Sequence, residues 1–173
     1  KTAVLTAQEM RGLKLFEAED KGNCAACHPS QIGEDGELPL FTDFSYDNLG
    51  VPKQVNLPFY TMSKNINNAG KEYIDVGLAG NPNIKDPQAQ LGKFKVPTLR
   101  NIAKTAPYMH NGVFLTLKES VEFYNTRDVD DKWAGAEVAT NVNKDELGNL
   151  KLTKEEVDDL VSFLHTLDDG YMP

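Results

Sequence analysis

The chain has 173 residues, with 18 Lys and Arg against 26 Asp and Glu, a formal net charge of −8 and two cysteines. This length predicts one domain over residues 1–173, large enough to bury its own core. The acidic balance argues against a nucleic-acid partner and favours a basic protein partner. No stretch approaches the ~18 uncharged apolar residues of a membrane span, and two cysteines cannot make a disulfide-rich scaffold.

The first predicted helix covers Ala7–Ala18. Thr6 and Glu9 have the spacing of a capping box, in which the two side chains satisfy each other's free backbone amides. We expect Met10, Leu13 and Phe16 to face inward, since they share one face at helical spacing. The helix should end before Gly22 and lead directly into the two cysteines.

The sequence Cys24-Ala25-Ala26-Cys27-His28 is the attachment pattern of c-type haem. Thiols three positions apart can form thioethers with the two vinyl groups on one porphyrin edge, and His28 can then place its imidazole under the ring as an iron ligand. A redox-active disulfide would be expected with a βαβ pattern, which is missing here. A zinc site would need two more ligands from a chain whose other histidines are His110 and His165. The pattern therefore predicts one covalent haem c.

Haem c is attached outside the cytoplasm in bacteria, so we expect an exported, periplasmic protein whose partners are periplasmic redox proteins. The chain begins Lys1-Thr2-Ala3-Val4 without an apolar signal region, as expected of a processed product.

Residues 29–95 show little periodicity, and Gly, Pro, Asn and Asp recur in them as turn formers. So long an irregular segment is unusual in a compact domain, but loops wrapped around a haem would explain it, because the haem supplies part of the core. Candidate haem contacts, for which ordinary loop packing is an equal alternative, are Pro39, Leu40, Phe41, Phe44, Tyr46, Leu49 and Phe59.

Three further helices are predicted in the second half of the chain. One opens at Pro97 and runs to about Lys104, because proline suits a first helical turn. A shorter one covers Leu117–Tyr124, and the last follows Thr153; each of these two starts with a capping box. The last helix carries an apolar stripe at helical spacing, made of Val157, Leu160, Val161, Leu164 and Leu167.

Several segments resemble one protein family. They are KVPTLRNI at residues 95–102, TAPYMHNG at 105–112, the FTDFSYDNLG segment at 41–50, and the ending from Leu152 to Leu167. Together they resemble the C-terminal haem domain of bacterial di-haem cytochrome c peroxidases and their MauG-like relatives. The resemblance implies an all-α, cytochrome-c-like fold with three to five helices around one covalently bound haem and with long loops.

In that family, two cytochrome-c-like domains each hold a haem; the N-terminal haem reacts with peroxide and the C-terminal haem transfers electrons. This chain is similar to the electron-transfer half. The resemblance places Arg100 close to the haem, where a guanidinium could pair with a propionate; a solvated helix residue is the alternative. The carbonyls of Thr105 and Pro107 match part of an interdomain calcium site. Where the family usually has Asp after the histidine, this chain has Asn111.

The second iron ligand decides the chemistry. A thioether raises the reduction potential, a phenolate lowers it, and an open position can bind peroxide. The candidates are Met109, Tyr124, His110, Met62 or an open site. Met109 is favoured, because it follows the haem motif and precedes the final helix as in small cytochromes c, and because the family takes its axial methionine from the same stretch.

Two main functions follow. The first is a mono-haem c-type cytochrome that transfers electrons in the periplasm. The alternative is a peroxide-using haem enzyme of the cytochrome c peroxidase or MauG type, or the electron-transfer domain of one. Peroxide chemistry needs an acid–base group above the iron; Glu119 and Glu122 are available, but only as residues of a solvated face. A gas sensor with a labile second ligand is a third possibility.

Overall fold

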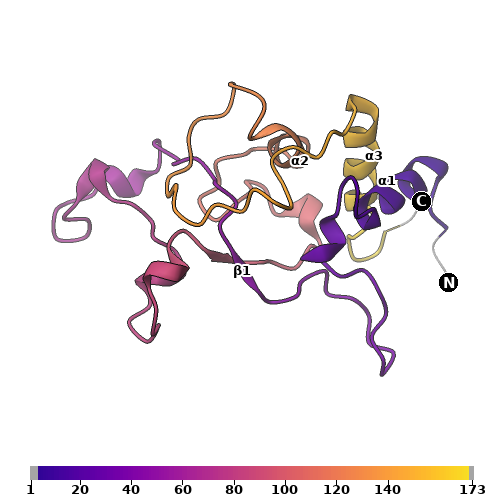
Figure 1. Cartoon of the computed structure of the whole chain (residues 1–173), viewed down its shortest axis with the longest axis horizontal. Coiled ribbons are helices and arrows are strands. Elements are labelled where there is room, and N and C mark those ends of the chain that lie inside the picture. Colours follow the sequence, from indigo (N-terminus) through magenta and orange to yellow (C-terminus); the bar gives the residue numbers. More distant parts are fainter. Residues whose placement is uncertain (1–3, 172–173) are drawn as a thin grey trace.

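The computed structural model describes residues 4–171, so the predicted processed start at Lys1–Ala3 lies outside the described residues. Its α-helices are α1 (Ala7–Glu17), α2 (Leu117–Thr126) and α3 (Lys154–His165), and its strands are β1 (Tyr46–Asp47) and β2 (Phe94–Lys95). Figure 1 shows α1 beside α3 at one end of the molecule and long loops at the other. Three helices and a two-stranded ribbon confirm the predicted all-α class.

α1 and α3 begin with the complete capping boxes that the sequence predicts. The Glu9 carboxylate accepts from the Thr6 amide at 2.7 Å, and the Thr6 hydroxyl oxygen accepts from the Glu9 amide at 3.3 Å. Thr153 and Glu156 repeat this at 2.8 and 3.2 Å. The start of each helix is therefore stabilised by hydrogen bonds within its own first turn.

α2 ends at Thr126, two residues beyond its predicted end. Only one of the two hydrogen bonds of its predicted capping box forms. The Thr116 hydroxyl oxygen accepts from the Glu119 amide, but the Glu119 carboxylate accepts from the amide of Leu115 at 2.9 Å. α2 packs through Phe123, which is fully buried. Phe123 contacts Phe114 and Trp133 with ring centroids 4.9 and 5.3 Å apart, so α2 is held in an aromatic cluster.

α1 and α3 approach each other closely at Gly12. A Cβ at this position would meet the backbone carbonyl of Asp159, so only glycine fits. Arg11 clamps the Asp159 carboxylate through two hydrogen bonds of 2.7 and 2.9 Å. Next to this contact, Phe16 packs edge-on against Phe163 at 5.2 Å.

The inward face predicted for α1 is wrong at Met10, which is 41% exposed. The buried positions of the helix are Glu9, Gly12 and Phe16. Glu9 lies on the inner face because Gly12 permits the close crossing of α1 and α3 and because the Glu9 carboxylate accepts hydrogen bonds from Thr6 and Tyr171. Leu13 is half-buried and Phe16 is fully buried, as expected.

The predicted helix from Pro97 to Lys104 is wrong; only a short 3₁₀ turn, Ile102–Lys104, forms there. The residues before it are extended because they continue the ribbon: Tyr46 pairs with Lys95, and the Val96 amide donates to the carbonyl of Ser45 at 2.9 Å. Asn101 then takes a left-handed conformation, with φ 59°, which ends any helix.

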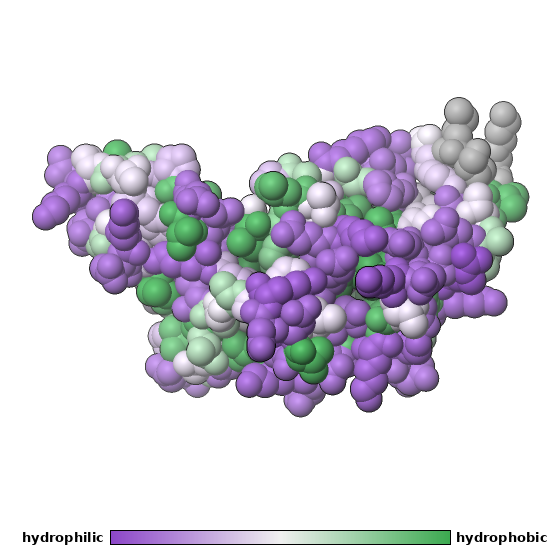
Figure 2. Space-filling model, turned by 90° about the horizontal axis from the view of Figure 1, so that it is seen from above, coloured by the Kyte–Doolittle hydropathy of each residue, from purple (hydrophilic) through white to green (hydrophobic). Residues whose placement is uncertain are grey.

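Apart from the two residues of β1, the segment between the haem motif and β2 is loop with isolated 3₁₀ turns, as predicted. Part of it forms a lobe, residues 53–75, that projects from the body at the left of Figures 1 and 2. Within the lobe, Phe59 packs against Tyr73 at 5.0 Å, and the Lys53 ammonium lies 4.6 Å from the Tyr60 ring. Within residues 4–171, none of the helices combines the length and the apolar character that a membrane crossing requires.

Candidate haem c site

The CAACH segment folds into a single tight turn. Cys24–Ala26 is a 3₁₀ turn, and the Cys24 carbonyl accepts from the amides of Cys27 and His28 at 3.3 and 2.9 Å. This turn brings residues three and four positions apart onto one side. Both thiols and the His28 ring accordingly line the same cavity.

The cavity has a volume of about 420 Å³ and lies among the three helices and the loops around residues 92–110 and 137–150. Most of its lining is apolar. Four of the five predicted haem-binding residues line it, namely Cys24, Cys27, His28 and Met109. An apolar pocket with two thiols and an imidazole fits a covalently attached haem.

The His28 ring is oriented by a backbone carbonyl. Its Nδ1 atom lies 2.7 Å from the carbonyl oxygen of Phe41. Because a carbonyl can only accept, Nδ1 carries the proton and Nε2 remains free as a ligand. Burial lowers the pKa of the His28 imidazole, which favours the neutral form that binds iron.

The two thiols are unsuited to disulfide exchange. Burial raises the pKa of the Cys24 thiol to about 12. Burial, followed by the nearby Glu146 and Asp43 carboxylates, raises the pKa of the Cys27 thiol to about 11. Redox-active cysteines have lowered pKa values, so the electrostatics count against the redox-disulfide alternative.

Met109 lies in a tight loop that brings it to the same cavity. The loop is closed by a 2.7 Å hydrogen bond from the Tyr108 amide to the Phe114 carbonyl, and the Gly112 amide donates to the Met109 carbonyl. Met109 has φ 68° and is half-buried. A positive φ is uncommon for methionine, so the surrounding loop imposes this conformation.

Of the other candidate iron ligands, Tyr124 and His110 also line the cavity, and Met62 does not. Burial raises the pKa of the Tyr124 phenol. The His110 ring stacks on Phe94 with centroids 3.5 Å apart and planes 7° apart, and burial lowers its pKa. Met62 is 45% exposed in the projecting lobe and is no part of the cavity lining.

Arg100 lies beside the site but does not line the cavity. Its Nε atom donates to the Pro39 carbonyl at 3.0 Å, and its guanidinium lies 5.1 Å from the Phe41 ring centroid. The guanidinium thus covers the residue that orients His28, and its contact with a propionate stays a prediction.

The aromatic and apolar residues proposed as haem contacts fall into two groups. Leu49 lines the cavity. The others do not line the cavity. Phe41 is buried (6% exposed), the Pro39 carbonyl accepts from Arg100, and Phe59 lies in the lobe. The remaining three are exposed to solvent: Leu40 (55%), Phe44 (59%) and Tyr46 (45%).

Asn48 is a site residue that sequence reasoning missed. It is 4% exposed, lines the cavity, and donates through Nδ2 to the carbonyls of Val138 at 3.0 Å and Thr140 at 2.8 Å. Its Oδ1 accepts from the Gly50 amide at 2.9 Å. One side chain therefore attaches the loop around residue 140 to the edge of the cavity. The only signal for it was the Asn-Leu-Gly turn.

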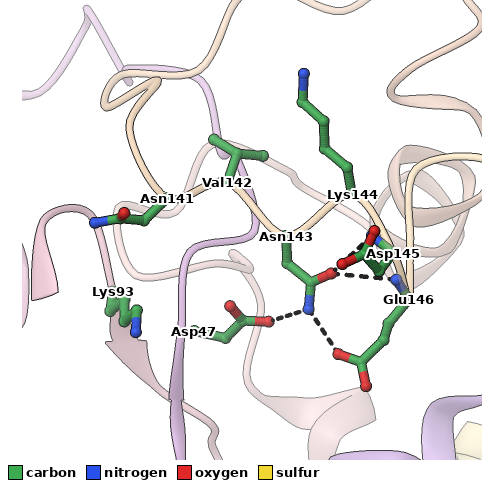
Figure 3. A pocket seen from close by; sticks show the side chains of 8 residues that line it. All are labelled: Asp47, Lys93, Asn141, Val142, Asn143, Lys144, Asp145 and Glu146. Carbon is green, nitrogen blue, oxygen red and sulfur yellow. Dashed lines mark hydrogen bonds between the residues drawn. The ribbon is translucent and has the colours of Figure 1, made fainter. Parts of the chain in front are cut away.

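A second, open hollow adjoins the cavity at residues 141–146 (Figure 3). At its centre, Asn143 Nδ2 donates to the carboxylates of Asp47 at 2.7 Å and Glu146 at 2.6 Å. Asp47 and Glu146 line both the hollow and the haem cavity. The hollow is therefore the outer, polar rim of the haem site, and Asn143 satisfies the two carboxylates that it shares with the cavity.

The remaining predicted functional residues are placed as follows. Asn111 donates to the Pro52 carbonyl at 2.8 Å, which the family's usual aspartate could not do when ionised. Glu119 and Glu122 do not line the cavity; Glu122 pairs with Lys132 at 3.3 Å. No group of three or more His, Cys, Asp or Glu side chains suited to a metal ion occurs in the described part of the chain, and calcium at Thr105 and Pro107 stays a prediction.

Comparisons with known proteins agree with this geometry. Residues 9–168 match the family model described as "Cytochrome c". The methylamine utilization protein MauG of Paracoccus denitrificans is 41% identical over 85% of this chain and 39% of its own length. The cytochrome-c peroxidase IdrP1 of Denitromonas iodatirespirans is 33% identical over 95% of this chain and 41% of its own.

The crystal structure of the diheme peroxidase BthA from Burkholderia thailandensis superposes with a TM-score of 0.80 and 37% identity, covering 97% of this chain and 44% of that one. The chain thus spans about two fifths of the length of the relatives it matches. By its matching family model and its haem-binding turn, the chain belongs to the cytochrome c family, as a relative of MauG and the di-haem cytochrome c peroxidases.

Proposed function

We propose that this chain is the electron-transferring haem c domain of a di-haem, peroxidase-type oxidoreductase that works in the bacterial periplasm with basic redox partners. The observation that carries the proposal is the single cavity shared by Cys24, Cys27, His28 and Met109. The similarity to MauG, IdrP1 and BthA favours the peroxidase alternative over a free-standing mono-haem carrier.

Each residue has a defined task in this proposal. Cys24 and Cys27 hold the haem covalently, and His28 presents Nε2 to the iron because Phe41 fixes its Nδ1 proton. Met109 would supply a thioether to the iron, which would favour the reduced state and raise the potential. A bound haem c supplies reversible one-electron chemistry, and the apolar lining excludes water from it.

A peroxide reaction at this same haem is the second candidate, because titratable groups do reach the cavity. His110 and Glu137 line it, as does Asp75, whose charge acts on His110. An acid–base group above the iron is what O–O cleavage requires. Occupation of the iron by Met109 is what separates the two functions.

The test is spectroscopy of the holoprotein and three variants. A ferric low-spin spectrum with the weak far-red band of methionine ligation is expected, and Met109→Ala should remove this band. Tyr124→Phe should retain it, and so should the matched control Met10→Ala, which alters an exposed methionine on α1. A high-spin ferric spectrum that changes on adding hydrogen peroxide would overturn the electron-transfer role and support the second candidate.

The peroxidase-type assignment is tested with the protein expressed from its complete natural reading frame. Hydrogen-peroxide-dependent oxidation of a reduced small cytochrome should be present and should fall strongly with Met109→Ala. Electron exchange without any peroxide-dependent turnover would support the mono-haem carrier instead.

A further inference from the structure

Arg127, the residue at the C-terminal end of α2, carries a guanidinium that is almost fully buried. Its side chain is 6% exposed, whereas that of Arg11 on α1 is 59% exposed. The Nε and Nη2 atoms of Arg127 donate to the two oxygens of the Asp128 carboxylate at 3.0 and 2.6 Å. The buried charge is therefore paired with a carboxylate, and the two parallel hydrogen bonds fix the plane of the guanidinium.

The guanidinium also donates to three backbone carbonyls. Nη1 donates to the carbonyl of Leu49 at 2.8 Å. Nη2 donates to the carbonyls of Asn143 at 2.8 Å and Leu147 at 3.3 Å. Leu49 follows β1, whereas Asn143 and Leu147 belong to the loop that precedes α3. One side chain therefore joins the end of α2 to two segments that are distant from each other in the sequence.

Two glycines leave the space that the Arg127 side chain occupies. A Cβ at Gly50 would lie 3.3 Å from Arg127 Cδ, and a Cβ at Gly148 would lie 2.6 Å from its Nη2. The Gly148 amide also donates to the Tyr124 carbonyl at 2.7 Å, so the loop is attached to α2 by backbone as well. The two segments thus fit closely around the guanidinium on both sides.

The segments that Arg127 joins form one wall of the haem cavity. Leu49 lines the cavity on the side of β1, and Glu146, Leu147 and Leu150 line it from the loop before α3. Arg127 itself does not line the cavity. It can therefore act on a bound haem only through the position of this wall.

We propose that Arg127 is a positioning residue that closes the wall formed by Leu49 and residues 143–150 and thereby keeps water away from the haem. The inference rests on the proposed function only in that a haem c occupies the cavity, and it is independent of the second iron ligand. Ferric haem carries one positive charge more than ferrous haem, so exclusion of water disfavours the ferric state and raises the reduction potential. Opening the wall should therefore lower the potential.

Two substitutions separate the shape of the Arg127 side chain from its charge. Arg127→Lys keeps the positive charge but loses the planar set of donors, and Arg127→Met keeps only the apolar length. We expect both holoproteins to have a lower reduction potential than the parent, measured by redox titration of the haem absorbance. Amide hydrogen exchange of residues 143–150 should be about tenfold faster in both, as loss of buried hydrogen bonds implies.

Arg11→Met is the matched control for general destabilisation. It breaks another bidentate pair between arginine and carboxylate, with Asp159 at 2.7 and 2.9 Å, and neither residue lines the cavity. The control should keep the parent's reduction potential and the parent's exchange rates in residues 143–150, although it lowers the free energy of unfolding.

The outcomes distinguish the positioning role from the function beneath it. If the parent protein carries no covalent haem, the proposed function itself is wrong. If the parent titrates reversibly and both Arg127 variants keep its potential, only the positioning role is wrong, even if their exchange is faster. A potential that falls in Arg127→Met but not in Arg127→Lys would show that the charge acts rather than the wall, and it would equally overturn the positioning role.

Discussion

The Nδ1 atom of His28 lies 2.7 Å from the carbonyl oxygen of Phe41. Phe41 has φ 53°, a left-handed conformation that is strained for a bulky side chain. Its ring holds it there: it packs on Phe16 with centroids 6.1 Å apart, beneath the guanidinium of Arg100. The packing of the Phe41 ring thereby fixes the position of the Phe41 carbonyl, which in turn orients the His28 imidazole.

We expect Phe41→Ala to lower the free energy of unfolding of the holoprotein by about 3–5 kcal/mol, the cost of removing a buried aromatic ring. Phe41→Leu, which retains most of the apolar volume, should cost less than about 1.5–2 kcal/mol. Denaturant unfolding followed at the haem absorbance measures both. Equal losses in the two variants would show that the ring is not what stabilises this turn.

The parts of the site that the structure brings together as the sequence predicts are those specified by neighbouring residues. Cys24, Cys27 and His28 lie within one turn, so their spacing alone places them on a common side, and all three line the cavity. The capping boxes at Thr6 and Thr153 are equally local, and both form. Met109 lines the same cavity, and its ligation of the iron, expected from chain order and family resemblance, stays a prediction.

The errors come from contacts between distant residues. Met10 is more apolar than Glu9, yet Glu9 is buried because Gly12 sets the crossing with α3, and the partner residue Asp159 is 147 positions away. Pro97 permits a helix, but pairing of the preceding residues with β1 and the left-handed Asn101 prevent it. Asn48 bonds to carbonyls 90 and 92 positions away, which no local pattern indicates.

We expect Gly12→Ala to destabilise the protein although alanine is the better helix former by about 1 kcal/mol. The added methyl group would meet the Asp159 carbonyl, which is backbone and cannot move alone, so α1 and α3 must separate. The net loss should be about 1–3 kcal/mol, measured by thermal or denaturant unfolding. The control Lys14→Ala alters an exposed position on the same helix and should be nearly neutral. A stabilised Gly12→Ala would contradict the close crossing.

Replacement of Asn48 should loosen the loop around residue 140. Asn48→Ala leaves the carbonyls of Val138 and Thr140 without their buried donor, at a cost of about 1–3 kcal/mol. Hydrogen exchange should accelerate in residues 137–143 more than in α1 or α3. Asn48→Asp is the informative comparison, because it retains an acceptor for the Gly50 amide but loses both donations. If exchange rises equally throughout the chain, Asn48 is not a local attachment.

The ion pair between Lys21 and Glu156 predicts a specific loss of stability in acid. Lys21 precedes the haem-binding turn, and its ammonium lies 2.5 Å from the Glu156 carboxylate at the start of α3. The Lys21 hydrogen bond and then the Thr153 amide hold the pKa of Glu156 below its ordinary value. The folded state therefore binds fewer protons than the unfolded state over this range, so the contribution is complete above the ordinary pKa of about 4.5 and is lost as the pH falls through the lowered value.

In Lys21→Gln, the Glu156 pKa should rise towards its ordinary value, and the decline in stability between about pH 5 and pH 3 should become shallower. Near neutral pH, the variant should be less stable by about 0.2–1 kcal/mol, as for a partly exposed pair, and the two proteins should converge in acid. Lys14→Gln removes the same charge from α1, where Lys14 forms no ion pair with any residue of the described range, and should shift the whole curve little. Unfolding free energies measured across this pH range decide the matter: parallel curves for the parent and Lys21→Gln would mean that the pair does not set the acid limb, and the link between the haem-binding turn and α3 would then rest on packing alone.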